Sequence, residues 1–146
     1  MGGWIALHLA LLRGERVRAV VGIAAAPDFT DWGFSDGQKA ALRRDGKIEE
    51  PNPYGPDPQS VTLAFWESGE RLCLLDREIP IDAPVRLLHG ELDREVPLDI
   101  AFRLMRRLRS SDVQLNVLKG GAHRLSEPHE INAILRTVEQ LLELSA

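Results

Sequence analysis

This sequence has few of the residues that staple small secreted domains or bind structural metals. It contains one cysteine, Cys73, which excludes a disulfide framework and a cysteine-based zinc site. No two histidines and a carboxylate stand at metal-ligand spacing, so we expect neither a metal nor a cofactor. A lone cysteine is typical of a reducing compartment, where it packs as a small apolar side chain.

Long apolar runs and an excess of positive charge are also missing. No stretch is long enough to cross a bilayer, and no basic segment precedes the short apolar run of residues 4–12, as it would in a signal peptide. Met1-Gly2 resembles the start of a myristoylation signal, but Ala6 stands where that signal requires serine or threonine. The formal net charge of −4 gives no reason to expect a nucleic-acid partner. These observations predict a soluble, cytoplasmic protein.

The chain does have enough apolar residues for one core. It has 146 residues, of which 44% are hydrophobic, as in a single folded domain. Apolar spacing predicts a helix over 3–13, and helices with a proline at their start are expected over 97–109 and 127–144. Three short, nearly uncharged runs predict buried strands: RVRAVVGIAAAP, APVRLLHG and VQLNVLKGGAH. Strands alternating with helices of this length indicate an α/β fold with a three-stranded parallel sheet.

Residues 28–82 interrupt this alternation, and we interpret them as a lid-like insertion. The run PNPYGPDP has four prolines in eight residues and cannot hold regular structure, whereas helices are expected over 36–45 and 58–73. Six of the eight aromatic residues of the chain lie in this insertion. They either line a substrate pocket or form a small core of their own, and the sequence leaves both interpretations open. The candidates for substrate contact are Trp32, Phe34 and Trp66.

Ionisable side chains follow two of the three expected strands, at the sheet edge where parallel α/β folds place reactive groups. One strand leads into H-G-E-L-D, which ends at Asp93, and the next leads into G-G-A-H, which ends at His123. Gly90 is expected to let the chain turn sharply between its strand and Asp93. One crossover helix separates the strands, so we expect Asp93 beside His123. Such a pair is either an ordinary surface hydrogen bond or two of the three members of a hydrolytic triad.

A serine nucleophile would complete such a triad, within a G-x-S-x-G motif on a strained turn between a strand and a helix. The opening residues MGGWIALHLA fit the end of that motif if Met1 follows the serine and Gly2 is the final glycine. The serine would then stand one position before Met1. We expect none of the seven serines in the chain to take the place of this nucleophile: Ser35, Ser60, Ser68, Ser110, Ser111, Ser126 and Ser145.

The segments MGGWIALHLA, PVRLLHGELDREVP and VQLNVLKGGAHRLS resemble the α/β-hydrolase superfamily. They are most similar to the small bacterial and mitochondrial hydrolases related to the abhydrolase-domain acyl-protein thioesterase, which also hydrolyses acyl glucuronides. The resemblance covers essentially the whole chain, but only the carboxyl-terminal half or so of the family's domain. It implies that Asp93 is the triad acid, His123 the general base and the Met1 backbone N–H one oxyanion donor. The earlier strands, the first oxyanion loop and the serine are not among these residues.

Alternatives remain for the site and for the function. Asp28 follows the first expected strand and could be the acid, but H-G-x-x-D followed by V-P favours Asp93. Glu91 and Glu95 are expected to be solvated turn residues, and His89 is expected to hydrogen-bond the adjacent loop. The first hypothesis is a serine hydrolase of small acyl esters or thioesters, in which this chain alone is inactive. The second is a truncated, non-catalytic remnant or a binding module, and the oligomeric state is open in both.

Overall fold

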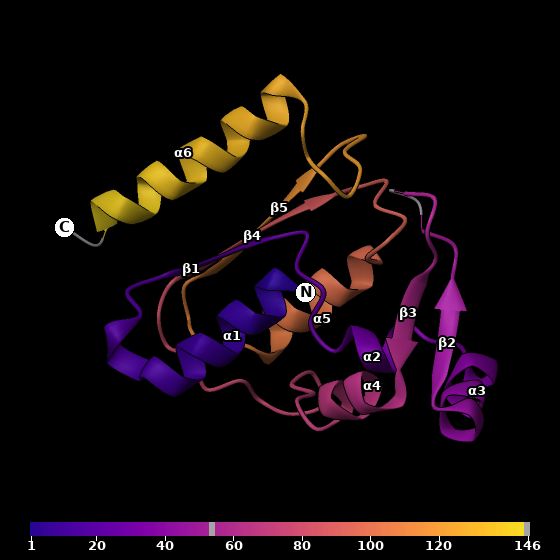
Figure 1. The fold of residues 1–146 in the computed structure, drawn as a ribbon. Helices are drawn as coiled ribbons and strands as arrows, with labels where there is room; N and C mark the ends of the chain where they lie inside the picture. Colours follow the sequence, from indigo (N-terminus) through magenta and orange to yellow (C-terminus); the bar gives the residue numbers. More distant parts are fainter. Residues whose placement is uncertain (53–54, 145–146) are drawn as a thin grey trace. The chain divides into compact units, whose positions relative to one another are not determined.

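The computed structural model describes residues 1–52 and 55–144, which form two compact units. The first unit, Met1–Pro27 with Leu74–Ala146, is built on a parallel sheet with the strand order β1-β4-β5 (Figure 1). Its strands are β1 (Val20–Ile23), β4 (Val85–Gly90) and β5 (Val113–Leu118). Val20 of β1 lies opposite Val85 of β4, which in turn lies opposite Val113 of β5. The expected α/β fold with three parallel strands is confirmed.

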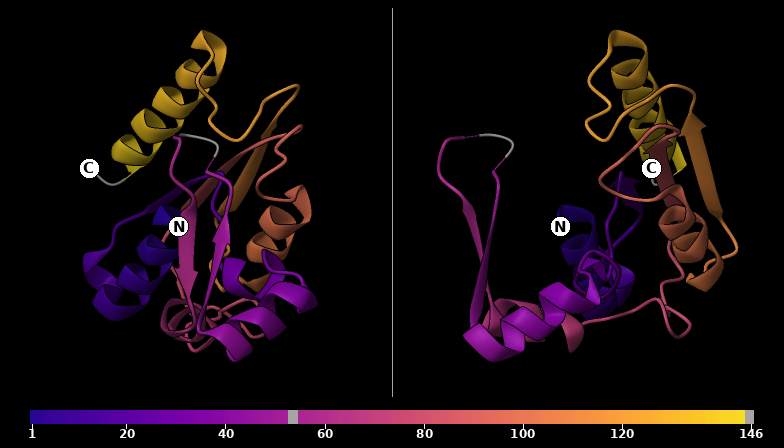
Figure 2. Two further views of the ribbon diagram at one scale, coloured as in Figure 1. Left: turned by 45° about the vertical axis from the view of Figure 1, so that its right-hand side comes forward. Right: turned by 90° about the vertical axis from the view of Figure 1, so that its right-hand side faces the viewer.

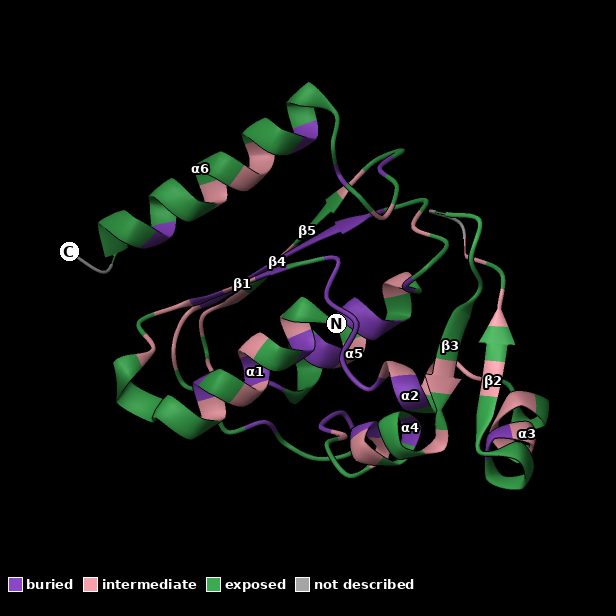
Figure 3. Ribbon diagram, viewed as in Figure 1, coloured by how far each residue is buried: buried purple, intermediate pink, exposed green. Residues whose placement is uncertain are grey.

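The helices of this unit lie on both sides of its sheet. Figure 1 shows α6 on one side and both α1 and α5 on the other. The central strand β4 is buried at every position, as expected for a parallel strand covered on both faces (Figure 3). The helical elements are α1 (Gly2–Arg13), the short 3-10 helix η1 (Gly14–Arg16), α5 (Leu98–Arg107) and α6 (Pro128–Leu144).

Helix α1 shows why the spacing of apolar residues predicted it correctly. Trp4, Leu7 and Ala10 recur every three residues and are the buried positions of the helix. Gly14 ends the helix with a φ of 50°, a value that residues with a side chain rarely adopt. The backbone N–H groups of Trp4 and Ile5 donate to the carbonyl of Met1, so Met1 stands directly at the amino end of the helix.

In its described residues, 28–52 and 55–73, the second unit (Asp28–Cys73) has three helices and an antiparallel hairpin. Figure 2 shows the hairpin as a ribbon that meets α3 and α4 at one of its ends. Helix α3 begins with a capping box between Ser35 and Gln38, which fixes its start where the sequence predicts it. The elements are α2 (Phe29–Trp32), α3 (Asp36–Asp45), β2 (Lys47–Glu50), β3 (Gln59–Thr62) and α4 (Leu63–Glu70).

The hairpin corrects the prediction of one helix over 58–73. Residues 59–62 form β3 instead, with Ile48 opposite Val61 and Lys47 opposite Thr62. Residues 59–62 form a strand because Val61 and Thr62 are β-branched and pair with a segment that lies well before them in the chain. Thr62 then caps α4, since its hydroxyl accepts a hydrogen bond from the Phe65 N–H.

The compact second unit is shorter than the insertion expected over 28–82. Residues 74–82 belong to the first unit, where the backbone N–H of Ile79 donates to the carbonyl of Arg107. The run PNPYGPDP joins β2 to β3, but Pro53 and Tyr54 within it lie outside the described residues. A lid function for this segment stays a prediction.

Candidate active site

The site begins with Asp93, in the turn that follows β4. Its side chain is 0% exposed, and its Oδ1 accepts hydrogen bonds of 2.9 Å from the backbone N–H groups of Glu95 and Val96. Burial raises the pKa of Asp93, but the two backbone hydrogen bonds and a third from His123 outweigh it and lower the pKa below its ordinary value. Asp93 is therefore an ionised acceptor at neutral pH.

His123 supplies the third of these hydrogen bonds, from the loop that follows β5. Its Nδ1 lies 2.9 Å from Asp93 Oδ2, and its side chain is 31% exposed. An ionised carboxylate can only accept, so Nδ1 carries the proton and Nε2 is left as the basic nitrogen. Nε2 lies 3.6 Å from Oε2 of Glu95, whose side chain is 54% exposed. The sequence placed Asp93 and His123 together, and the structure brings them within hydrogen-bonding distance.

His89 lies before the turn that contains Asp93, and its side chain hydrogen-bonds to the residue at the end of that turn. It is the penultimate residue of β4 and is buried, and its Nε2 lies 2.9 Å from the Val96 carbonyl oxygen. The same nitrogen lies 3.5 Å from Asp93 Oδ2. The expectation that His89 hydrogen-bonds the adjacent loop is confirmed, and the bond ties the start of the turn to its end.

Gly90 and Gly121 allow the two site loops to touch. A Cβ added at Gly90 would lie 2.3 Å from the Gly121 carbonyl oxygen, and one at Gly121 would lie 3.1 Å from the Gly90 Cα. Neither glycine has a positive φ, whereas the neighbouring Gly120 has a φ of 72°. The expected sharp turn does begin at Gly90, since the Asp93 N–H donates to its carbonyl oxygen at 3.2 Å, and the position also needs glycine for the close backbone approach.

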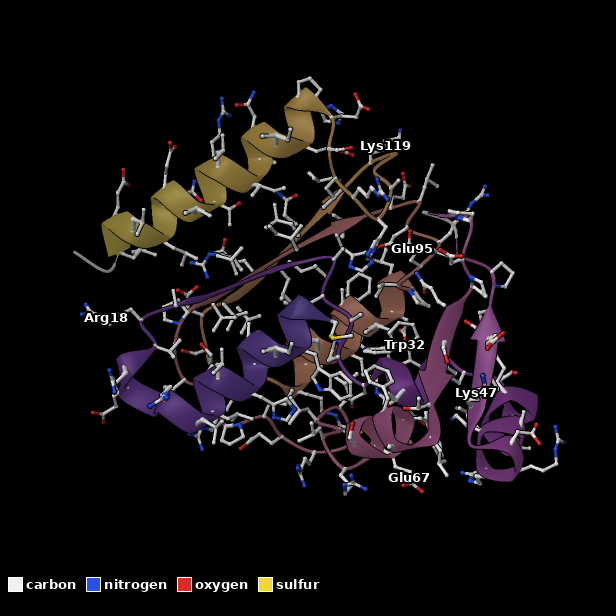
Figure 4. The ribbon with its side chains drawn as sticks, in the orientation of Figure 1. Arg18, Trp32, Lys47, Glu67, Glu95 and Lys119 are labelled. Carbon is white, nitrogen blue, oxygen red and sulfur yellow. The ribbon has the colours of Figure 1, made fainter. Side chains whose placement is uncertain are left out.

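Glu91 takes a role that the sequence does not indicate. It is exposed, as expected, yet its Oε2 accepts a hydrogen bond of 2.9 Å from the backbone N–H of Gly120. The contact joins the loop of Asp93 to the loop of His123. In Figure 4 the label on Glu95 marks the first loop and the label on Lys119 marks the second, and both loops lie at the same end of the sheet. No local pattern could have revealed it, because Gly120 and Glu91 meet only once β4 and β5 are paired.

The remaining predicted site residues occupy different places. Met1 is exposed and precedes α1, whose amino end carries the partial positive charge of a helix dipole. Asp28 is buried at the start of the second unit with a φ of 56°, and the carboxylate hydrogen-bonded to His123 Nδ1 is that of Asp93. The proposed roles of Met1 and Asp93 stay predictions at this point.

The aromatic candidates divide into two kinds within the second unit. Trp66 is 5% exposed, its Nε1 donates to the Thr30 carbonyl at 2.9 Å, and the Arg43 guanidinium lies 4.7 Å from its ring centroid. These contacts make Trp66 part of the unit's own core, the second of the two interpretations left open by the sequence. Trp32 and Phe34 are half-buried.

Residues 1–52 and 55–144 include no group of three or more histidines, cysteines, aspartates or glutamates placed to hold a metal ion. No helix among the same residues is long and apolar enough to span a membrane.

Comparison with known proteins identifies the fold class. No family model matches the chain. A putative hydrolase from Agrobacterium vitis S4 is 34% identical with a TM-score of 0.86, over 97% of this chain and 58% of that one. This likeness, together with the parallel sheet, defines the fold as that of the α/β hydrolases. The chain belongs to the α/β-hydrolase superfamily, as its sequence motifs indicate.

Within that superfamily the chain resembles one particular group. It is 32% identical over 147 residues to the human mitochondrial palmitoyl-protein thioesterase ABHD10. The aligned region covers 98% of this chain and 48% of that protein. The structure of mouse ABHD10 matches 99% of this chain and 59% of its own, at 31% identity and a TM-score of 0.87. The chain thus spans about half the length of the curated relatives it matches.

Proposed function

We propose that this chain supplies the acid and the base of a serine hydrolase that cleaves acyl esters or thioesters. His123 Nε2 removes the proton from a serine hydroxyl as its oxygen attacks the acyl carbonyl carbon, and then gives that proton to the leaving group. Asp93 holds the ring and stabilises the imidazolium that forms between these steps. The observation that carries the proposal is the 2.9 Å hydrogen bond from His123 Nδ1 to Asp93 Oδ2, since it leaves Nε2 as the base.

The remaining parts of the catalytic machinery follow from the same proposal. The backbone N–H of Met1, at the amino end of α1, is one donor to the oxyanion of the tetrahedral intermediate. The nucleophile in this proposal is a serine outside the 146 printed residues. Ser35 is the one serine within them that has the spacing G-x-S-x-G, in Gly33-Phe34-Ser35-Asp36-Gly37. It follows helix α2 rather than a strand, and its hydroxyl caps α3 by accepting from the Gln38 N–H, so it lacks the strand-to-helix turn of a nucleophile. Water then attacks the acyl-enzyme with His123 acting as base a second time, which releases the carboxylic acid and restores the serine.

The names of the relatives support a substrate with a long acyl chain in thioester linkage, since the ABHD10 proteins are named palmitoyl-protein thioesterases. Trp32 and Phe34 are the better candidates for contact with that chain, because Trp66 is committed to the core of its own unit. The cytoplasmic location expected from the sequence stays a prediction, as the human relative is named a mitochondrial protein.

A chimera tests the proposal. This chain replaces the matching region of the Agrobacterium vitis hydrolase, and hydrolysis of a palmitoyl thioester and of a neutral ester is measured. We expect activity that His123→Ala lowers by ~10³-fold or more. The matched control is Glu139→Ala, an exposed carboxylate on α6 that we expect to leave the rate unchanged. An active chimera that keeps its rate after His123→Ala would contradict the proposed role of His123.

The one G-x-S-x-G of the chain surrounds Ser35, whose hydroxyl caps helix α3, and this favours a second candidate for the isolated chain, a non-catalytic domain with at most a binding function. A fluorophosphonate probe, which reacts with activated serines, separates the two candidates. We expect the 146-residue chain to remain unlabelled and the chimera to become labelled. Serine-specific labelling of the isolated chain would show that the nucleophile lies within it after all.

A further inference from the structure

The loops of Asp93 and His123 are joined by contacts that involve neither of those side chains. The backbone N–H of Glu91 donates to the Leu118 carbonyl, and that of Leu92 donates to the Gly121 carbonyl, both at 2.9 Å. The Gly120 N–H donates to Glu91 Oε2 at 2.9 Å. These three hydrogen bonds therefore join the turn after β4 to the turn after β5 independently of the bond between Asp93 and His123.

Glu91 contributes the one of these three bonds that has a side chain as acceptor. Its acceptor is a carboxylate oxygen, and hydrogen bonds to charged acceptors are stronger than those between neutral groups. The bond reaches Gly120, which lies in the same loop as His123 and close to it in sequence. A change at Glu91 therefore acts on the backbone that carries the base, at a distance from the base itself.

Gly120 depends on this bond more than its neighbour Gly121 does. Gly121 is enclosed, since a Cβ added there would meet Glu130 Oε1 and Leu125 Cδ2 at 2.9 Å. A Cβ added at Gly120 would meet no atom within 4 Å, so side-chain packing does not restrain this residue. The φ of 72° at Gly120 is one that glycine leaves easily, because it has no Cβ to restrict its backbone. The turn that contains Gly120 is closed by the Gly121 N–H, which donates to the Leu118 carbonyl at 3.1 Å. The Glu91 carboxylate adds a hydrogen bond to the Gly120 N–H itself and so restrains its peptide group directly.

We propose that Glu91 is a positioning residue for His123. Its carboxylate fixes the Gly120 N–H, and the loop so held delivers the His123 ring to Asp93 with Nδ1 facing the carboxylate. The importance of this role for catalysis rests on the proposed function, whereas the positioning itself is a property of the 146-residue chain.

NMR spectroscopy of the ¹⁵N-labelled chain tests the proposal without any need for catalysis. The two readouts are the hydrogen-exchange rate of the Gly120 amide and the resonance of the His123 Nδ1 proton. We expect Glu91→Ala to speed the exchange by roughly tenfold or more and to broaden or abolish the Nδ1 proton signal. Glu91→Gln keeps an oxygen acceptor and should restore most of both readouts. Glu139→Ala, on α6, should change neither.

Unchanged Gly120 exchange and an unchanged His123 signal in Glu91→Ala would overturn the proposal. Wild-type protein gives an answer even if that variant fails to fold, since a Gly120 amide that exchanges as fast as in an unstructured peptide would also overturn it. In the active chimera we expect Glu91→Ala to lower kcat with little change in KM. If the chimera is inactive while both NMR effects appear, the proposed function fails and the positioning role stands.

Discussion

Substitution of Gly90 by alanine tests how closely the two site loops pack. The added Cβ would lie 2.3 Å from the Gly121 carbonyl oxygen and 2.7 Å from that of Ala122. Both oxygens belong to the backbone of the loop that carries His123, so no side-chain rotation can relieve the overlap. The end of β4 or this loop has to move by roughly 1 Å to reach an ordinary van der Waals separation.

The size of the effect follows from the kind of atoms that clash. Extra methyl groups in well-packed regions typically cost about 1–3 kcal/mol, and a clash with backbone belongs at the upper end. We therefore expect Gly90→Ala to lower the free energy of unfolding by about 3 kcal/mol. For a chain of this length the loss corresponds to a fall in Tm of about 10 °C.

The assay is urea unfolding followed by tryptophan fluorescence, with thermal unfolding as a second measurement. Gly2→Ala is the matched control, because a Cβ at this first residue of α1 would meet no atom within 4 Å. We expect the control to leave the stability unchanged or to raise it by up to about 1 kcal/mol. A Gly90→Ala protein within about 0.5 kcal/mol of wild type would refute the close approach of the loops.

Three further predictions concern single groups. The lowered pKa of Asp93 gives stability that is present above its ordinary value of 3.8 and lost as the pH falls through the lower folded-state pKa. Between about pH 5 and pH 2 wild type should therefore lose more free energy of unfolding than Asp93→Asn. Equal losses in the two proteins, measured by urea unfolding at each pH, would contradict this. His89→Leu removes the donor to the buried Val96 carbonyl and should cost about 2 kcal/mol in the same assay, whereas an equal unfolding midpoint would show that the bond is dispensable. Burial, with the nearby carboxylates of Asp28, Glu70 and Asp31, raises the pKa of Cys73 to about 11. Iodoacetamide at pH 8 should therefore alkylate the folded chain far more slowly than the urea-unfolded chain. Equal alkylation rates would argue against the raised pKa.

The sequence predicts those parts of the fold that depend on local pattern or on simple topology. Helix α1 is evident from its apolar spacing, and β4 from a nearly uncharged run of the kind that a central parallel strand requires. The pairing of Asp93 with His123 was also predictable, because one crossover helix between two strands places the strands side by side and their ends at one edge.

The parts that the sequence does not predict depend on contacts between distant segments. Residues 59–62 look helical in isolation and become a strand only against Lys47–Glu50. Glu91 has the composition of a solvated turn, and its bond to Gly120 exists only after β4 and β5 have paired. Gly90 likewise gives no sign in sequence that it faces the backbone of Gly121.

The most direct test of the central claim is the rate at which the chimera hydrolyses a palmitoyl thioester when it carries Asp93→Asn. Asparagine keeps the size of the side chain but removes the charged acceptor for His123 Nδ1, so the ring loses the tautomer that leaves Nε2 basic. We expect kcat to fall by ~10³–10⁴-fold relative to Glu139→Ala in the same background. A fall of less than about tenfold would contradict a catalytic role for the Asp93–His123 pair.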